Sequence, residues 1–153
     1  GALLADAPHT RPIPVMVTAN TPEVAKRYNV VTSRYEGPTG IIGALHDGAT
    51  QREIDAISMW ASVPHYVSSP PCPKATLALI ESLEDFLDLS ISSGDLVERS
   101  RAWEKQVDEI ATEDSEVGDY VRQLEKAKDE SDVATGDSIA REVERFLRRN
   151  SDR

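Results

Sequence analysis

Two Pro-His motifs carry residue types that could do chemistry. Pro8-His9-Thr10-Arg11-Pro12 and Val63-Pro64-His65-Tyr66 each follow an apolar run that is typical of a strand. Because ligands of open α/β sheets bind beyond the carboxyl ends of the strands, we expect both motifs on one rim. There a histidine could transfer protons, Arg11 could hold an anion in its guanidinium fork, and Tyr66 could stack on a ring. The alternative is that each proline ends its strand and the histidines hydrogen-bond loop backbone.

Lys74, at the start of the following helix, could reach the same anionic ligand, or it could be a solvated surface lysine. The candidate ligand-binding set is therefore His9, Thr10, Arg11, His65, Tyr66 and Lys74. We assign no catalytic residue, no metal ligand and no cofactor from the sequence. These side chains suggest an anionic small-molecule ligand.

Three other positions give weaker signals. Gly37-Pro38-Thr39-Gly40 resembles a phosphate-cradling loop at a helix start, but it lacks the Gly-Lys-Ser/Thr and GxGxxG patterns, which favours a plain turn. His46-Asp47 could bind a metal or pair a base with its acid, although no second ligand lies at helical spacing, so an exposed or capping role is favoured. Cys72, between two prolines, is predicted to be an inert loop thiol. No Gly-x-Ser-x-Gly elbow occurs, which weakens a serine-hydrolase interpretation.

Length and charge narrow the function classes. A chain of 153 residues forms one domain of ordinary size, and its net charge of −10 argues against nucleic acid and anionic membranes as partners. No apolar run approaches the roughly 20 residues of a membrane-spanning helix. The single cysteine excludes an internal disulfide and favours the cytoplasm. The apolar run at residues 1–5 starts without an initiator Met or a signal peptide, so we expect further strands upstream.

The expected elements form an α/β domain followed by helices. Residues 13–19 and 56–63 have strand composition, with a helix opening at Thr21-Pro22-Glu23 and another over 41–49. Strand, helix and strand at this spacing predict a βαβ unit and a parallel sheet. A further helix follows Pro73. We divide the chain into residues 1–93, part of an α/β domain, and residues 94–153, an acidic helical extension packed on it.

The extension carries 28 of the 44 charged residues and none of the nine prolines. Its apolar residues recur three and four apart from Trp103 to Leu124, with Asp114 at one of these seam positions. This pattern predicts either a helical hairpin turning near Asp114-Ser115 or one long bent helix. A last helix is expected after Gly136-Asp137-Ser138, burying Ile139, Val143, Phe146 and Leu147. The seam packs on its own domain, or it binds a partner helix or a second protomer.

Several segments together resemble the proteasome assembly chaperone 2 family, most closely its actinobacterial, largely uncharacterised branch. The segments are LLADAPHTRP at 3–12, RYEGPTG at 34–40, WASVPHYV at 60–67 and PKAT at 73–76, with RAWE at 101–104 and DYVRQLE at 119–125. The resemblance implies the C-terminal half of a longer chain. It also implies part of a three-layer α/β/α sandwich, of the phosphorylase or hydrolase kind, with a C-terminal helical extension.

The same resemblance implies a non-enzymatic protein that self-associates and acts as an assembly chaperone or interaction protein. Relatives that dock on the proteasome core often end in a hydrophobic-Tyr-any tripeptide, whereas this chain ends Asn150-Ser151-Asp152-Arg153, so docking by that route is not expected. The alternative function is a binding protein or enzyme for a nucleoside-like or phosphate-like small molecule at the strand-end rim. It rests on the phosphorylase-type fold that the resemblance implies and on the placement of both Pro-His motifs at strand ends. Fold analogy alone carries that alternative weakly, because function resides in sites rather than in folds.

Overall fold

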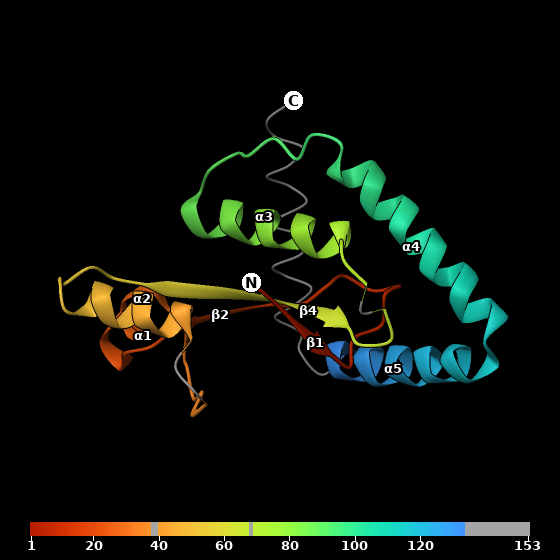
Figure 1. Ribbon diagram of the computed structural model, residues 1–153, viewed down its shortest axis with the longest axis horizontal. Helices are drawn as coiled ribbons and strands as arrows, with labels where there is room; N and C mark the ends of the chain where they lie inside the picture. Colours follow the sequence, from red (N-terminus) through yellow and green to blue (C-terminus); the bar gives the residue numbers. More distant parts are fainter. Residues whose placement is uncertain (38–39, 68, 134–153) are drawn as a thin grey trace.

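The computed structural model describes residues 1–37, 40–67 and 69–133. Four strands form one sheet in the order β1 (Ala2–Ala5), β4 (Ile57–Pro64), β2 (Val15–Ala19) and β3 (Val31–Thr32). Figure 1 shows the long strand β4 running through the centre of this sheet, with helices above, below and beyond its ends. The strand at the start of the chain is confirmed as β1, and Pro14 lies just before β2 begins.

The sheet is mixed, and the expected parallel pairing of residues 13–19 with 56–63 is wrong. β2 and β4 run antiparallel, with Val15 opposite Ala61, while β1 is parallel to β4. The parallel crossover from β2 passes instead through α1 (Pro22–Tyr28) into β3, which has only two residues. Period and composition identify a strand but not its direction, and a strand this short leaves almost no pattern.

One face of the sheet is closed by α3 (Pro73–Leu87), which packs on β4 and β2. The buried core consists of Ile13, Ala61, Val63 and Ala75, with Val15, Cys72, Ala78 and Leu79 packed against it. All these side chains are apolar and compact, so their burial supplies the main stabilisation of the sheet. Tyr28, the last residue of α1, contacts Phe86 of α3, with ring centroids 5.8 Å apart.

The other face carries α2 (Ile41–Thr50), so helices lie on both faces and the three-layer α/β expectation is confirmed. His46 places α2 there, because its Nε2 lies 2.8 Å from the Ser58 hydroxyl and Ser58 points away from the α3 face. Large apolar side chains on this side remain exposed. They are Leu3 and Met16 on the sheet and Ile41, Ile42 and Leu45 on α2, and Trp60 lies half-buried among the sheet positions. We call these six residues the α2 side.

Two long helices, α4 (Leu96–Glu113) and α5 (Ser115–Val133), form a hairpin, which decides between the two alternatives for the tail. The break falls at Asp114, whose backbone is extended and whose carboxylate caps α5 through the N–H groups of Glu116 and Val117. Trp103 and Val107 of α4 and Val121 of α5 are buried. α4 packs on α3, and α5 packs on α4 (Figure 1).

The helix expected after Gly136-Asp137-Ser138, with Ile139, Val143, Phe146 and Leu147, lies outside the described residues. Within the described part of the chain, no helix combines the length and the apolar character needed to cross a membrane.

Candidate functional site

The strand-end rim exists because β1 and β4 are parallel neighbours. Ala5 pairs with Pro64 at the ends of the two strands, so both chains leave the sheet at the same edge. Ala7 and Pro8 are buried just after β1 and carry the chain inward to His9. His65 and Tyr66 follow β4 directly. The structure therefore brings the two Pro-His motifs together, as the sequence predicts.

His9 is the centre of the rim, and its side chain is only 1% exposed. Its Nδ1 lies 2.9 Å from the Tyr66 hydroxyl, and its backbone N–H donates to the same hydroxyl at 2.8 Å. Its Nε2 lies 2.9 Å from Oδ1 of Asp108 on α4. Both ring nitrogens are engaged, so the imidazole joins the ends of β1 and β4 to α4 rather than facing an open cavity.

Lys74 ties the same loop to the same helix. It lies in the first turn of α3, where proline at the first position fixes the start of the helix. Its ammonium group donates to the backbone carbonyl of His9 and to the carboxylate of Glu104 on α4. The lysine is largely buried, and its charge is balanced within the chain.

Thr10 and Arg11 contact α5 instead. The Thr10 hydroxyl donates to Oε1 of Glu125 at 2.5 Å, and Arg11 holds Asp129 with two parallel bonds of 2.9 and 2.8 Å. A third bond of 3.3 Å joins Arg11 to Glu125. The fork geometry is the one that guanidinium groups use for carboxylates. Its hydrogen bonds hold the pKa of Asp129 below the ordinary value and raise that of Arg11.

Aromatic rings close the outer part of the rim. Tyr120 of α5 meets the rings of His65 and Tyr66 edge-on, at centroid distances of 5.3 and 6.0 Å. The carboxylate of Asp6 accepts from the Tyr120 hydroxyl at 3.0 Å and lies 3.3 Å from Nδ1 of His65. Burial raises the pKa of Tyr66 to about 12, against the opposing effect of the His9 backbone N–H.

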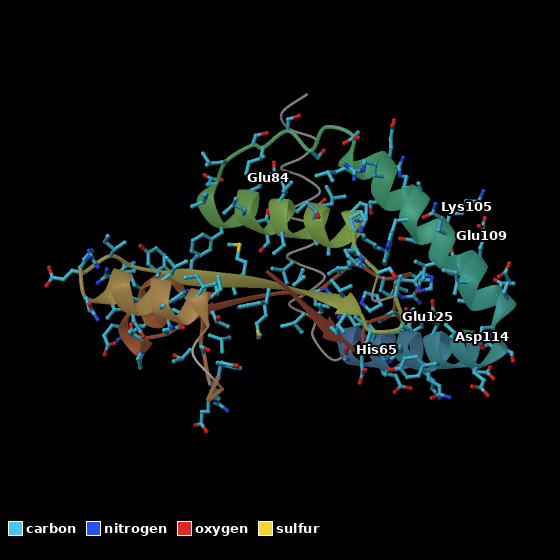
Figure 2. The ribbon with its side chains drawn as sticks, in the orientation of Figure 1. His65, Glu84, Lys105, Glu109, Asp114 and Glu125 are labelled. Carbon is cyan, nitrogen blue, oxygen red and sulfur yellow. The ribbon has the colours of Figure 1, made fainter. Side chains whose placement is uncertain are left out.

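The six predicted residues are thus brought together. Carboxylates of this chain meet five of them, and the hydroxyl of the sixth, Tyr66, bonds to His9 instead. The partners that sequence reasoning missed are Glu104, Asp108, Glu125 and Asp129, which come from α4 and α5. Glu104 and Asp108 are four residues apart, and so are Glu125 and Asp129. This helical spacing beside the apolar seam is the signal in the sequence that could have identified them. Figure 2 shows the contrast with Lys105 and Glu109, which point outward from α4.

Two weaker candidates are placed clearly. His46 is buried and bonded to Ser58, so the expected exposed or capping role is wrong: α2 turns that face of the helix onto the sheet. Cys72 lies half-buried at the cap of α3, where burial raises the pKa of its thiol. Among the residues that the structure describes, no group of His, Cys, Asp and Glu side chains could hold a metal ion.

Surface cavities also lie among the described residues, and two of them are defined by their linings. One of about 600 Å³ lies beside the rim and is lined by Arg11, Arg122, Glu125, Lys126, Asp129 and Glu130. Its lining mixes both charges, which are largely paired with each other. The other, of about 330 Å³, lies near the start of β4 and is lined by Tyr28, Asp55, Ile57, Met59, Leu83, Phe86 and Leu87.

A family model described as the PAC2 family matches residues 1–111, a match that runs from β1 into α4. The chain belongs to the PAC2 family. The matched segment includes all six predicted rim residues together with Glu104 and Asp108 of α4, whereas Glu125 and Asp129 of α5 lie beyond it. The PAC2 match confirms the family that the sequence motifs indicate.

Solved structures agree with this assignment. A PAC2 family protein from Streptomyces avermitilis is 51% identical, with a TM-score of 0.69, over 79% of this chain and 51% of that one. A proteasome-assembly chaperone homologue from Mycobacterium tuberculosis is 47% identical, with a TM-score of 0.65 and the same coverage. A protein of unknown function from Corynebacterium glutamicum is 29% identical, with a TM-score of 0.71, over 85% of this chain and 48% of that one.

The PAC2 chain described here therefore spans about half the length of these relatives. Among curated proteins, none matches the sequence.

Proposed function

We propose that this chain is a non-enzymatic interaction protein with an assembly-chaperone-like role, and that it associates through the α2 side of its sheet. The single observation that carries the proposal is the exposure of large apolar residues there. Met16 is 50% exposed and Leu45 is 61% exposed. Grouped exposed apolar side chains mark protein interaction surfaces more often than they mark ordinary solvated surface.

A second copy of the chain is the first partner that we propose. The chain carries a net charge of −10, so two copies repel each other except where an uncharged surface can be buried. The α2 side consists of uncharged side chains, which supply such a surface. The description of the M. tuberculosis relative as a proteasome-assembly chaperone homologue supports the broader chaperone-like role. The single cysteine is the reason for placing the protein in the cytoplasm.

The division of the chain at residue 94 is part of the same proposal. Residues 1–93 would supply the interacting sheet, and the acidic helical extension would close its strand-end edge. The rim contacts support this division, because α4 and α5 supply the carboxylates that meet His9, Arg11 and Lys74.

The proposal is tested by measuring mass in solution. Sedimentation equilibrium of the whole chain should give more than the 16.8 kDa of one copy, and Met16→Lys combined with Leu45→Lys should return it to that mass. Leu89→Lys is the matched control, because Leu89 is equally exposed but lies in the connector after α3. A monomeric wild-type chain that also captures no protein from a cell extract after crosslinking would overturn the proposal.

The alternative is a nucleoside-like or phosphate-like ligand at the rim, as the sequence suggests. The convergence of His9, Arg11 and Lys74 favours it. Four carboxylates at the same place oppose it, since an anion would have to displace them. A thermal-shift screen of such ligands decides, because any ligand bound to the folded state must raise the melting temperature. His65→Ala should remove a shift that arises at the rim.

A further inference from the structure

We propose that α5 is a latch over the strand-end rim: it swings as one unit about Asp114, and its contacts with Thr10 and Arg11 hold it closed. α4 and α5 divide the rim between them. α4 contacts His9 and Lys74, while α5 contacts Thr10, Arg11, His65 and Tyr66. Opening α5 alone therefore uncovers four of the six rim residues and leaves His9 and Lys74 in contact with α4.

The two helices are anchored differently. α4 buries Ser100, Trp103 and Val107 and packs along α3. α5 buries only Val121 among its residues with described side chains, and Tyr120 and Leu124 are half-buried. Apolar burial supplies most of the free energy that holds a helix in place. The smaller buried surface therefore makes α5 the easier of the two helices to detach.

The contacts that hold α5 to the rim are polar and close to solvent. Arg11 and Asp129 are 35% and 55% exposed, and Tyr120 reaches Asp6 at the surface. Exposed ion pairs contribute little individually and are weakened by salt. Regions held in this way open locally at a lower free energy than the core does.

The hinge is short and well defined. Asp114 is the single residue between α4 and α5, and Figure 2 shows it at the corner where the two helices meet. Ile110, one turn before the hinge, is 52% exposed. A change in the backbone angles of Asp114 can move α5 while α4 stays on α3.

α5 also has the means to stay helical once it is detached. Arg122 pairs with Asp119, and Lys126 lies 4.0 Å from Glu130, so both pairs lie within the helix at stabilising spacings. Asp114 caps its first turn from the hinge itself. With 19 residues, α5 exceeds the length of about 12–15 residues below which isolated helices are marginal.

Amide hydrogen exchange on the whole chain tests the latch, read separately on α3, α4 and α5. In the wild type, the backbone amides that are hydrogen-bonded within α5 should exchange faster than the corresponding amides of α3. Asp129→Asn should raise the α5 rates by about three- to fivefold and leave the α3 and α4 rates unchanged. Raising NaCl from roughly 0.05 M to roughly 0.5 M should do the same to the wild type and little to the variant.

Arg122→Gln is the control, because Arg122 pairs within α5 and not with the rim. It should leave the salt response of the wild type intact. Arg11→Gln removes the same contacts from the other side and should match Asp129→Asn. Equal changes in the exchange rates of α4 and α5 in every variant would show that the two helices open as one cooperative unit. That result, or an α5 exchange rate that does not depend on salt, would overturn the latch. These readouts are independent of self-association through the α2 side.

Discussion

The strand-end rim and the α2 side use opposite kinds of residue in opposite ways. The rim gathers His9, Arg11 and Lys74, the types that sequence motifs flag as reactive, and this chain's own carboxylates meet each of them. The α2 side gathers ordinary apolar residues such as Met16 and Leu45, which remain exposed. The difference teaches that residue chemistry alone does not locate a binding surface. What matters is whether the chain already supplies a partner.

Removing the buried imidazole of His9 should have the largest effect and tests whether the rim is structural. His9→Ala should cost about 2–4 kcal/mol, because it leaves a cavity and strips the Tyr66 hydroxyl of a partner. His65→Ala, the same change on the same rim, should cost less than about 1 kcal/mol, because that side chain is 45% exposed. Urea unfolding followed by tryptophan fluorescence measures both. Equal small losses would mean that the rim is not structural.

Two glycines test how tightly each region is packed. A Cβ on Gly118 would lie 2.7 Å from the Ala111 carbonyl oxygen, so Gly118→Ala should push α4 and α5 apart and cost about 1–3 kcal/mol. Gly48 of α2 meets only the end of the Arg52 side chain within 4 Å. Gly48→Ala should be neutral or stabilising by up to about 1 kcal/mol. Thermal unfolding compares the pair, and a reversed order would contradict the packing described here.

Alkaline pH should weaken the rim through Tyr66. Its pKa of about 12 lies above the ordinary 10.0, so the fold favours the neutral phenol. The resulting stabilisation is complete below pH 10 and is lost as the pH rises towards 12. Absorbance titration of the tyrosines should show a late component that Tyr66→Phe diminishes, while Tyr28 and Tyr120, whose pKa values are also raised, still contribute to it. That variant should also flatten the fall of stability over the same pH range, and an unchanged fall would contradict the assignment.

The α2 side should show the smallest effect on stability. Met16→Lys places a charge where the side chain is half exposed, so the free energy of unfolding of the single chain, measured at a protein concentration low enough to separate the copies, should change by less than about 0.5 kcal/mol. Urea unfolding checks this directly. A loss as large as that of His9→Ala would mean that the α2 side is part of the core.

The position of the rim could be predicted because the end of each strand is marked by residues next to it in the sequence. Proline after each apolar run ends a strand, and parallel neighbours then bring His9 and His65 to one edge. The same reasoning assigned the wrong direction to β2 against β4, because alternation and composition carry no sign of direction. It also predicts an exposed or capping role for His46, because the residues of one helical turn do not reveal which face of the helix meets the sheet.

The partners of the rim were harder to predict for a physical reason. Asp108 and Asp129 contact residues about 100 or more positions away, and many acidic residues of the tail share their spacing on a helix. Only the hairpin at Asp114 selects which carboxylates turn inward. The exposure of the α2 side was equally hard to predict. Apolar residues in a sequence are expected in the core, and only the packing shows which of them remain exposed.

Sedimentation equilibrium of three whole-chain variants tests the central claim most directly. Wild type and Arg11→Gln should self-associate alike, while Met16→Lys with Leu45→Lys should sediment at the 16.8 kDa of a single copy. The opposite result, in which Arg11→Gln separates the copies and the α2-side variant does not, would contradict the account. It would mean that the copies bind through the rim and not through the α2 side.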